Sequence, residues 1–149
     1  MTATELLREQ HEQAQTLIEE LADADVDERE SILSELARVL RGHTAIEEEL
    51  LYPLLQRMPA FSAMMKESIA EHEQIKTSLS DLERCAPADE SFSDLVRQLE
   101  ADVSGHVKDE ESDLFPRLER EWTTDTLEQL GTDLQRRFEQ LVPEEGVWA

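Results

Sequence analysis

The sequence lacks the features of a secreted or membrane-spanning protein. Its 149 residues include one cysteine, Cys85, so no disulfide can form within the chain and a reducing compartment is expected. The first residues, MTATELLREQ, contain no basic segment followed by an apolar one, and no run of about 18 apolar residues occurs anywhere. We therefore expect a cytoplasmic protein that does not enter a membrane, with Cys85 as a free thiol in a loop.

Basic residues are also scarce. Lys and Arg number 14 against 36 Asp and Glu, which gives a formal net charge of -22 at pH 7. Such a charge repels phosphate backbones and anionic lipid, so we expect neither a nucleic acid partner nor a membrane partner. Metal cations are the partners that this charge favours.

Glycine, proline and aromatic residues are few, which favours a helical protein with an aliphatic core. Apolar residues recur at helical spacing, and this predicts four long amphipathic helices separated by short breaks near residues 24–27, 57–59 and 85–90. Short connections make neighbouring helices antiparallel. We therefore expect an all-α fold, an up-down-up-down four-helix bundle formed by residues 1–121.

Two parts of this pattern give specific expectations. The apolar stripe of the second helix comprises Ile32, Leu36, Val39, Leu50 and Leu54. Residues 122–149 are expected to form a fifth amphipathic helix and a tail, with Trp148 as a candidate anchor for the tail. The fifth helix would either cover the open end of the bundle or form a homodimer contact.

Two stretches of the chain repeat one another at an offset of 63 positions. GHTAIEEELLYPLL at residues 42–55 returns as GHVKDEESDLFPRL at residues 105–118, with glycine, histidine, two glutamates and proline in the same register. The repeat indicates a duplicated two-helix unit, in residues 3–57 and 60–120.

All four histidines of the chain belong to this repeat, and each continues an apolar stripe. Two of the histidines are followed four residues later by a glutamate, which places each pair on one helix face, about 6 Å apart along the axis. A buried carboxylate is costly unless a cation or a proton offsets its charge. The six candidate metal ligands are His11, His43, Glu47, His72, His106 and Glu110.

Imidazole and carboxylate groups together suit iron, manganese or zinc. Six inward ligands are more than one metal needs if it keeps exchangeable positions, and they fit two metals about 3.5–4 Å apart. We expect one metal on His11 and His43 and the other on His72 and His106, with Glu47 and Glu110 as bridges.

Other repeated residues have two interpretations. Gly42 and Gly105 are either remnants of the duplication or points of close helix approach near the metals. Tyr52 either packs in the core, which is favoured, or donates a hydrogen bond to a bound oxygen species. Pro53 and Pro116 each remove a helical hydrogen bond and are expected to kink or end a helix.

Glu48 and Glu111 lie one position beyond the expected bridges. In a regular helix they are rotated by about 100° from those bridges. We interpret both as surface charges, with Glu111 as the better substitute ligand.

These residues resemble the hemerythrin-like family, specifically its HHE cation-binding domain. The resemblance is carried by His11, by EHEQ around His72, and by the paired segments HTAIEEELLYP and HVKDEESDLFP, over residues 3–120. It implies a four-helix bundle with a non-haem di-iron centre. The six candidate residues would hold two iron ions, bridged by Glu47, Glu110 and an oxo or hydroxo group; zinc and manganese are less favoured.

The resemblance implies a protein that binds or senses O2, nitric oxide or peroxide, or that handles iron. Oxygen-carrying hemerythrins have a further histidine where this chain has Lys76, so reversible oxygen carriage is less favoured, and Lys76 is expected to pair with a carboxylate. The alternatives are a metal-stabilised protein-interaction module and a di-iron enzyme acting on peroxide or nitric oxide, with Tyr52 or Lys76 as the proton source.

Overall fold

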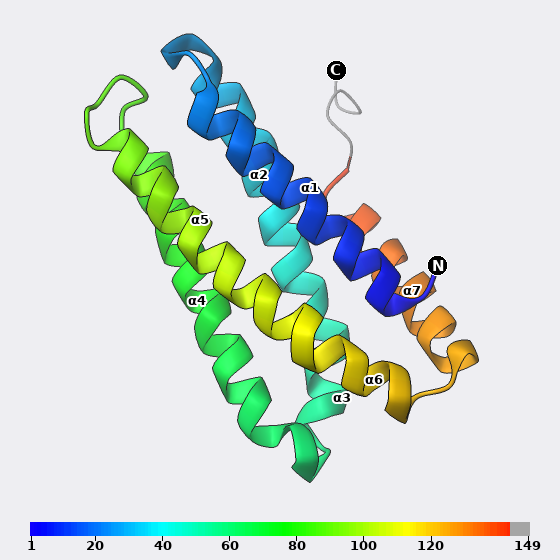
Figure 1. The fold of residues 1–149 in the computed structure, drawn as a ribbon. Coiled ribbons are helices and arrows are strands. Elements are labelled where there is room, and N and C mark those ends of the chain that lie inside the picture. Colours follow the sequence, from blue (N-terminus) through cyan, green and yellow to red (C-terminus); the bar gives the residue numbers. More distant parts are fainter. Residues whose placement is uncertain (144–149) are drawn as a thin grey trace.

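Four long helices run alternately up and down and form the body of the protein. In the computed structural model, which describes residues 1–143, they are α1 (Ala3–Asp23), α2 (Val26–Ile46), α4 (Ser62–Arg84) and α5 (Phe92–Asp109). α1 lies beside α2 and α5, and α4 lies beside α5 (Figure 1). The expected all-α, up-down-up-down bundle is confirmed, and the described residues contain no strand. Within residues 1–143, every helix is too short or too polar to cross a bilayer.

Two of the long helices contain a wide, π-helical turn. α2 continues through η1 (Glu47–Leu51) into α3 (Tyr52–Gln56), and α5 continues through η3 (Glu110–Leu114) into α6 (Phe115–Glu121). After each turn a backbone N–H donates to the carbonyl five residues earlier, from Tyr52 to Glu47 and from Phe115 to Glu110.

Pro53 and Pro116 explain where these turns occur. In a regular helix, a proline ring clashes with the carbonyl four residues earlier, and the proline has no N–H to donate. A wider turn directly before each proline relieves this clash. The expected kink or helix end therefore takes the form of a π-helical turn, and the chain continues as α3 and α6.

The π-helical turn in η1 also shifts the buried face of its helix. Leu50 and Leu54 were expected in the apolar stripe, but Leu50 is half-buried and the Leu54 side chain is 43% exposed. Leu51 and Leu55 are fully buried in their place. The expectation was wrong because the wider turn moves the inward face by one residue.

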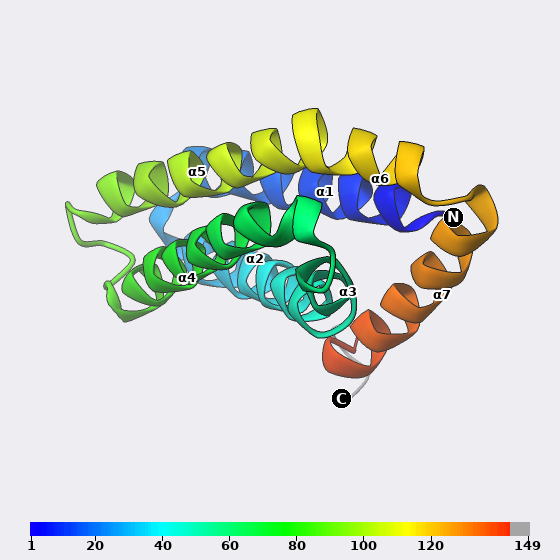
Figure 2. The same cartoon turned by 90° about the horizontal axis from the view of Figure 1, so that it is seen from below.

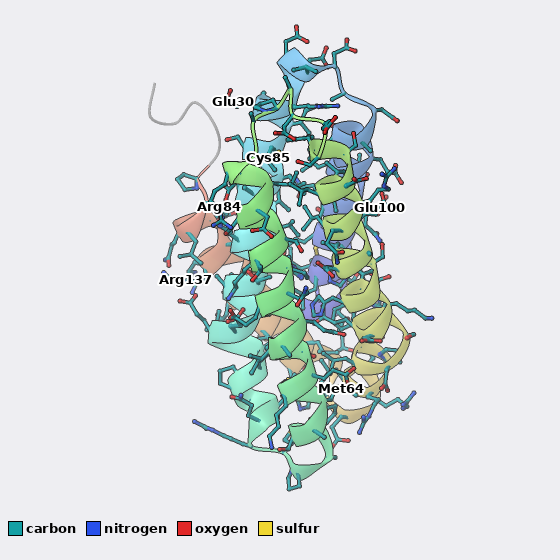
Figure 3. All side chains as sticks on the ribbon, turned by 90° about the vertical axis from the view of Figure 1, so that its left-hand side faces the viewer. Glu30, Met64, Arg84, Cys85, Glu100 and Arg137 are labelled. Carbon is teal, nitrogen blue, oxygen red and sulfur yellow. The ribbon has the colours of Figure 1, made fainter. Side chains whose placement is uncertain are left out.

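Apolar side chains form two separate clusters, one on each side of the middle of the bundle. The loop-end cluster lies between the four long helices near the connections α1–α2 and α4–α5, and it includes Leu21, Leu36, Leu82 and Leu99. The α7-end cluster lies around the π-helical turns and the start of α1. Figure 3 shows Glu30 and the free thiol of Cys85 at the loop end. The layer between the two clusters contains the polar residues described below.

The fifth helix, α7 (Thr124–Leu141), crosses the open end of the bundle beside α1 and α2 (Figure 2). It begins after Thr123, whose hydroxyl accepts a hydrogen bond from the Thr126 N–H. Its buried residues are Leu127, Leu130, Gly131 and Leu134. The apolar face of α7 therefore covers the bundle of its own chain, which is the first of the two roles expected for this helix. Trp148, the candidate tail anchor, lies outside the described residues.

The two repeated glycines, Gly42 and Gly105, have different surroundings. A Cβ atom added to Gly42 would lie 2.6 Å from Phe138 Cε2 and 3.1 Å from Val142 Cγ2, whereas one added to Gly105 would meet no atom of the described part of the chain within 4 Å. Gly42 is therefore a point of close helix approach, but the partner is α7 and its end rather than a metal-binding helix. Gly105 has no such contact and is explained by the duplication.

We predict that alanine at these two positions has opposite effects on stability. Gly105→Ala should raise the free energy of unfolding by about 0.5–1 kcal/mol, because alanine is the better helix former and the site is open. Gly42→Ala should lower it by about 1 kcal/mol, because Phe138 and Val142 must move away. Urea unfolding followed by circular dichroism measures both. Equal stabilisation by the two substitutions would contradict this account.

Candidate metal centre

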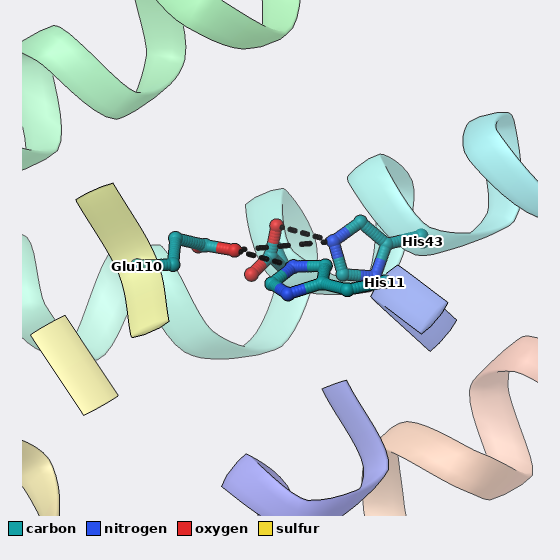
Figure 4. A group of neighbouring side chains, drawn as sticks. His11, His43 and Glu110 are labelled. Atoms are coloured by element: carbon teal, nitrogen blue, oxygen red, sulfur yellow. Dashed lines mark hydrogen bonds and ion pairs between the residues drawn. The ribbon is translucent and has the colours of Figure 1, made fainter. Parts of the chain in front are cut away.

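The structure brings the six candidate ligands together in the middle of the bundle. Each is exposed by no more than 4%, and together the six come from all four long helices and the two π-helical turns. The residues are His11 on α1, His43 on α2, Glu47 on η1, His72 on α4, His106 on α5 and Glu110 on η3. In Figure 4 the imidazoles of His11 and His43 and the carboxylate of Glu110 point toward one another.

The ligand atoms form two groups that share Glu47. In one group the ligand atoms of His11, His43, Glu47 and Glu110 all lie within 4.8 Å of one another, and the other group contains Glu47, His72 and His106. Glu47 Oε1 lies 3.1 Å from His43 Nε2 and 3.0 Å from His72 Nε2. Glu110 Oε1 lies 2.9 Å from His11 Nε2 and 3.2 Å from His106 Nε2. Each carboxylate thus contacts one histidine of each expected pair, as a bridge between two metals would.

Every histidine uses its outer nitrogen, Nδ1, to bind a second side chain. The acceptors are Glu111 Oε2 for His11 at 2.7 Å, Gln10 Oε1 for His43 at 2.8 Å, Glu48 Oε2 for His72 at 2.7 Å, and Glu71 Oε1 for His106 at 2.8 Å. An N–H at Nδ1 fixes the tautomer and the ring orientation, and it leaves the Nε2 lone pair free to bind a metal. We call these four acceptors the outer partners.

Sequence reasoning misjudged or missed all four outer partners. The interpretation of Glu48 and Glu111 as surface charges was wrong, because both carboxylates accept hydrogen bonds from buried imidazoles. Gln10 and Glu71 were not considered. The available signal was their position: each directly precedes a repeated histidine, and the two are related by the same offset as those histidines.

Tyr52 is directed into the centre. Its hydroxyl lies 2.9 Å from Glu110 Oε2, 3.2 Å from Glu47 Oε1 and 3.1 Å from His72 Nε2. Phe115, its counterpart in the repeat, stacks on His11 with ring centroids 5.6 Å apart. Core packing alone, the favoured interpretation of Tyr52, is therefore insufficient, because its hydroxyl is hydrogen-bonded to the candidate bridges.

The electrostatics of the centre favour bound positive charge. Burial opposes a charged imidazole, but the Glu110 and Glu111 carboxylates outweigh it and raise the pKa of His11 to about 9. Burial likewise opposes charge on His106, yet Glu110 raises the pKa of His106 well above its ordinary value. For His43 burial dominates and lowers the pKa. Bound metal would take the place of the protons held on the other imidazoles.

The pKa values of the Glu47 carboxyl group and the Tyr52 phenol shift in the directions expected beside these imidazoles and carboxylates. Burial raises the pKa of a carboxyl group, but the surrounding imidazoles, led by His43, hold the pKa of Glu47 well below its usual value. Burial and the Glu47 and Glu110 carboxylates raise the pKa of Tyr52 well above its usual value. The centre therefore contains an ionised carboxylate and a protonated phenol.

Two buried polar atoms in the centre have no hydrogen-bond partner among residues 1–143. These are His43 Nε2, which lies 3.1 Å from Glu47 Oε1 without hydrogen-bond geometry, and Glu47 Oε2. Buried polar atoms are almost always hydrogen-bonded, and a bound cation would account for two unpaired lone pairs in a cluster of histidines and carboxylates. The donor set of imidazole nitrogen and carboxylate oxygen fits iron, manganese or zinc.

Lys76 and a group of three carboxylates lie around this centre rather than in it. Lys76 Nζ is 3.0 Å from Glu48 Oε2 and is 38% exposed, so its expected pairing with a carboxylate is confirmed. The outer partner Glu71 also lies in a further group of carboxylates with the exposed Glu67 and Asp109. Exposed acidic groups are common on a chain with this net charge, and we assign no metal to them.

A bundle of four antiparallel helices with buried histidines and glutamates at its middle defines a class, the metal-binding helical bundle proteins. Comparison with protein families gives the family within it. Residues 2–118 match the family described as Hemerythrin HHE cation binding domain, and the chain belongs to this family.

Three relatives illustrate the match. A hemerythrin HHE cation binding domain-containing protein from Mycobacterium kansasii has a crystal structure that matches with a TM-score of 0.81 at 30% identity, over 95% of this chain and 87% of that chain. An uncharacterized protein of Mycobacterium tuberculosis is 28% identical over 144 residues, 95% of this chain and 88% of the relative. A DNA nickase of Nostoc sp. is 27% identical over 136 residues, which is 91% of this chain but only 38% of the nickase.

We predict a graded loss of metal along three consecutive glutamates. Glu47→Gln should abolish stable metal binding, because it removes the carboxylate shared by both ligand groups. Glu48→Gln should weaken affinity about 10–100-fold through His72. Glu49→Gln is the control, because Glu49 binds Arg137 on the surface. Metal content after dialysis and titration of metal-free protein measure the series. A Glu48→Gln protein indistinguishable from the control would contradict the role of the outer partners.

Proposed function

We propose that this chain is a non-haem di-iron protein that binds or senses O2, nitric oxide or peroxide. The observation that carries the proposal is that Glu47 and Glu110 each contact one histidine of each pair, at 2.9–3.2 Å. Two carboxylates in this arrangement suit two metals better than one. Among the metals that accept imidazole and carboxylate together, iron also binds diatomic ligands and changes oxidation state.

Different residues of the chain would bind the metals, orient the ligands and exclude water in such a centre. His11, His43, His72 and His106 would hold the two ions through Nε2, with Glu47 and Glu110 between them. The outer partners keep the imidazole rings oriented. The loop-end and α7-end clusters exclude bulk water from both sides of the layer. Six protein ligands for two metals leave coordination positions for a small molecule.

Tyr52 would interact with that small molecule. Tyr52 is the only tyrosine in the sequence. Its hydroxyl lies among the candidate ligands and can donate one hydrogen bond. A bound oxygen-containing ligand would compete with Glu47 and Glu110 for this donor. The elevated pKa of Tyr52 keeps its proton in place at neutral pH.

Lys76 supports sensing, redox chemistry or iron handling over reversible oxygen carriage. It occupies the position at which oxygen-carrying hemerythrins have a further histidine, and its ammonium group pairs with Glu48 outside the centre. One metal would therefore have one protein ligand fewer and one open position more.

A di-iron enzyme acting on peroxide or nitric oxide is the second candidate, and Tyr52 favours it. A phenol beside open metal positions is a proton donor for reduction of a bound ligand. The DNA nickase activity of the Nostoc relative is not carried over, because this chain covers only 38% of that protein and its net charge of -22 opposes DNA binding.

We predict that protein purified in air and reconstituted with iron contains about two iron ions per chain. It should absorb in the near-ultraviolet and blue region, because oxygen ligands transfer charge to ferric iron. Metal analysis and a visible spectrum measure both. One zinc ion and no colour would instead indicate a metal-stabilised interaction module, and no bound metal would refute every form of the proposal.

We further predict that Tyr52→Phe separates ligand binding from metal binding. Phenylalanine is the residue at the equivalent position of the second half, Phe115, so the core should accept it. At saturating iron the iron content should be unchanged, while affinity for nitric oxide should fall about tenfold through loss of one hydrogen bond. Anaerobic titration followed in the visible spectrum measures this affinity. Unchanged affinity and unchanged peroxide consumption would remove Tyr52 from the proposal.

A further inference from the structure

The outer partners of the four histidines follow the internal repeat, with one exception. Glu48 and Glu111 are equivalent in the repeat, and each binds the histidine of a helix in the other half. Gln10 and Glu71 are also equivalent, and each binds the histidine of the second helix in its own half. The exception is chemical, because Gln10 is a neutral amide where Glu71 is a carboxylate.

We propose that this difference makes the two metal positions inequivalent, so that the His72/His106 position binds metal first and more tightly than the His11/His43 position. The inference rests on the proposed di-metal centre. It concerns the order and affinity of loading, which neither the repeat nor the six ligands decide by themselves.

The physical reason lies in the acceptor at each Nδ1. A carboxylate accepts the N–H with a full negative charge, and such hydrogen bonds are about twice as strong as those between neutral groups. The stronger acceptor draws the Nδ1 proton away from the ring and makes Nε2 a better metal donor. An amide oxygen, as on Gln10, has this effect only weakly.

The number of carboxylate acceptors at each metal position gives the expected order of metal loading. The His72/His106 position has two carboxylates, Glu48 and Glu71, whereas the other position has Glu111 and the amide of Gln10. Nearby cations act differently on Glu48 and Glu111. Lys76 pairs with Glu48 at 3.0 Å, whereas Arg8 pairs with Glu119 and acts on Glu111 only through its charge. The difference between the two positions therefore rests on Glu71, the carboxylate that stands where the other position has the amide of Gln10.

The second asymmetry of the repeat acts in the same direction. The Tyr52 hydroxyl lies 3.1 Å from His72 Nε2 and adds an oxygen atom at the His72/His106 position. Phe115, its counterpart, stacks on His11 and offers no polar atom. Both differences between the halves therefore favour the same metal position.

The test is an anaerobic equilibrium titration of the metal-free protein with ferrous iron. The unmodified protein should bind two equivalents in two resolved steps. Glu71→Gln should raise the Kd of the first step about 10–100-fold and leave the second unchanged, and Gln10→Glu should lower the Kd of the second step by a similar factor. The double exchange, with both substitutions, should reverse the order of loading. His106→Ala and His43→Ala assign the steps, because each removes a ligand from one position.

Two surface substitutions control for net charge. Glu100→Gln removes one negative charge from the exposed face of α5 (Figure 3), and Gln13→Glu adds one to the exposed face of α1. Both should leave the two Kd values unchanged. Circular dichroism confirms that each variant remains helical, and the double exchange provides a second route if one single variant fails to fold.

The outcomes distinguish this inference from the proposed function. Two equal steps in the unmodified protein, an effect of Glu71→Gln on the second step, or effects no larger than the surface controls would overturn the inference while leaving the di-metal centre intact. Binding of a single equivalent by the unmodified protein would overturn the di-metal proposal itself.

Discussion

The burial of two carboxylates among four imidazoles is the constraint on which the rest of this structure depends. Glu47 is fully buried and Glu110 is 1% exposed, and within residues 1–143 their ion-pair partners are histidines rather than lysine or arginine. Carboxylates in such a place require positive charge, from protonated imidazoles or from metal. Because all four long helices contribute a histidine, this requirement ties the helices to one another at the middle of the bundle, between two apolar clusters.

The π-helical turns place adjacent residues in different roles around that centre. Glu47 faces the metal ligands while Glu48 binds the outer nitrogen of His72, and Glu110 and Glu111 repeat this arrangement toward His11. π-helical turns of this kind often occur at functional sites, where they change which side chains face inward. On one side the turn is further held by α7, because Arg137 binds Glu49 through two nitrogens at 3.0 and 3.1 Å.

Much of the fold and the ligand cluster could be predicted because the relevant signals are local and repeated. Helical spacing places a histidine and the glutamate four residues later on one face, and the repeat shows that this happens twice. The same reasoning failed for Glu48 and Leu54, because it assumed a regular α-helix past Glu47. The wider turn changes which residues face inward, and no residue count alone indicates it, although Pro53 marks its position.

The sequence by itself determined the all-α class, the four amphipathic helices, the inward faces of the histidines and the duplication, because each depends on spacing within one helix. Only the tertiary structure decided which side chains meet between helices. His11 and Glu111 are 100 positions apart, and their hydrogen bond depends on how α1 and η3 align. Gly42 and Gly105 are equivalent in sequence, yet only Gly42 meets Phe138, because α7 packs beside α2. Contacts of this kind depend on the relative positions of whole helices, which local spacing does not encode.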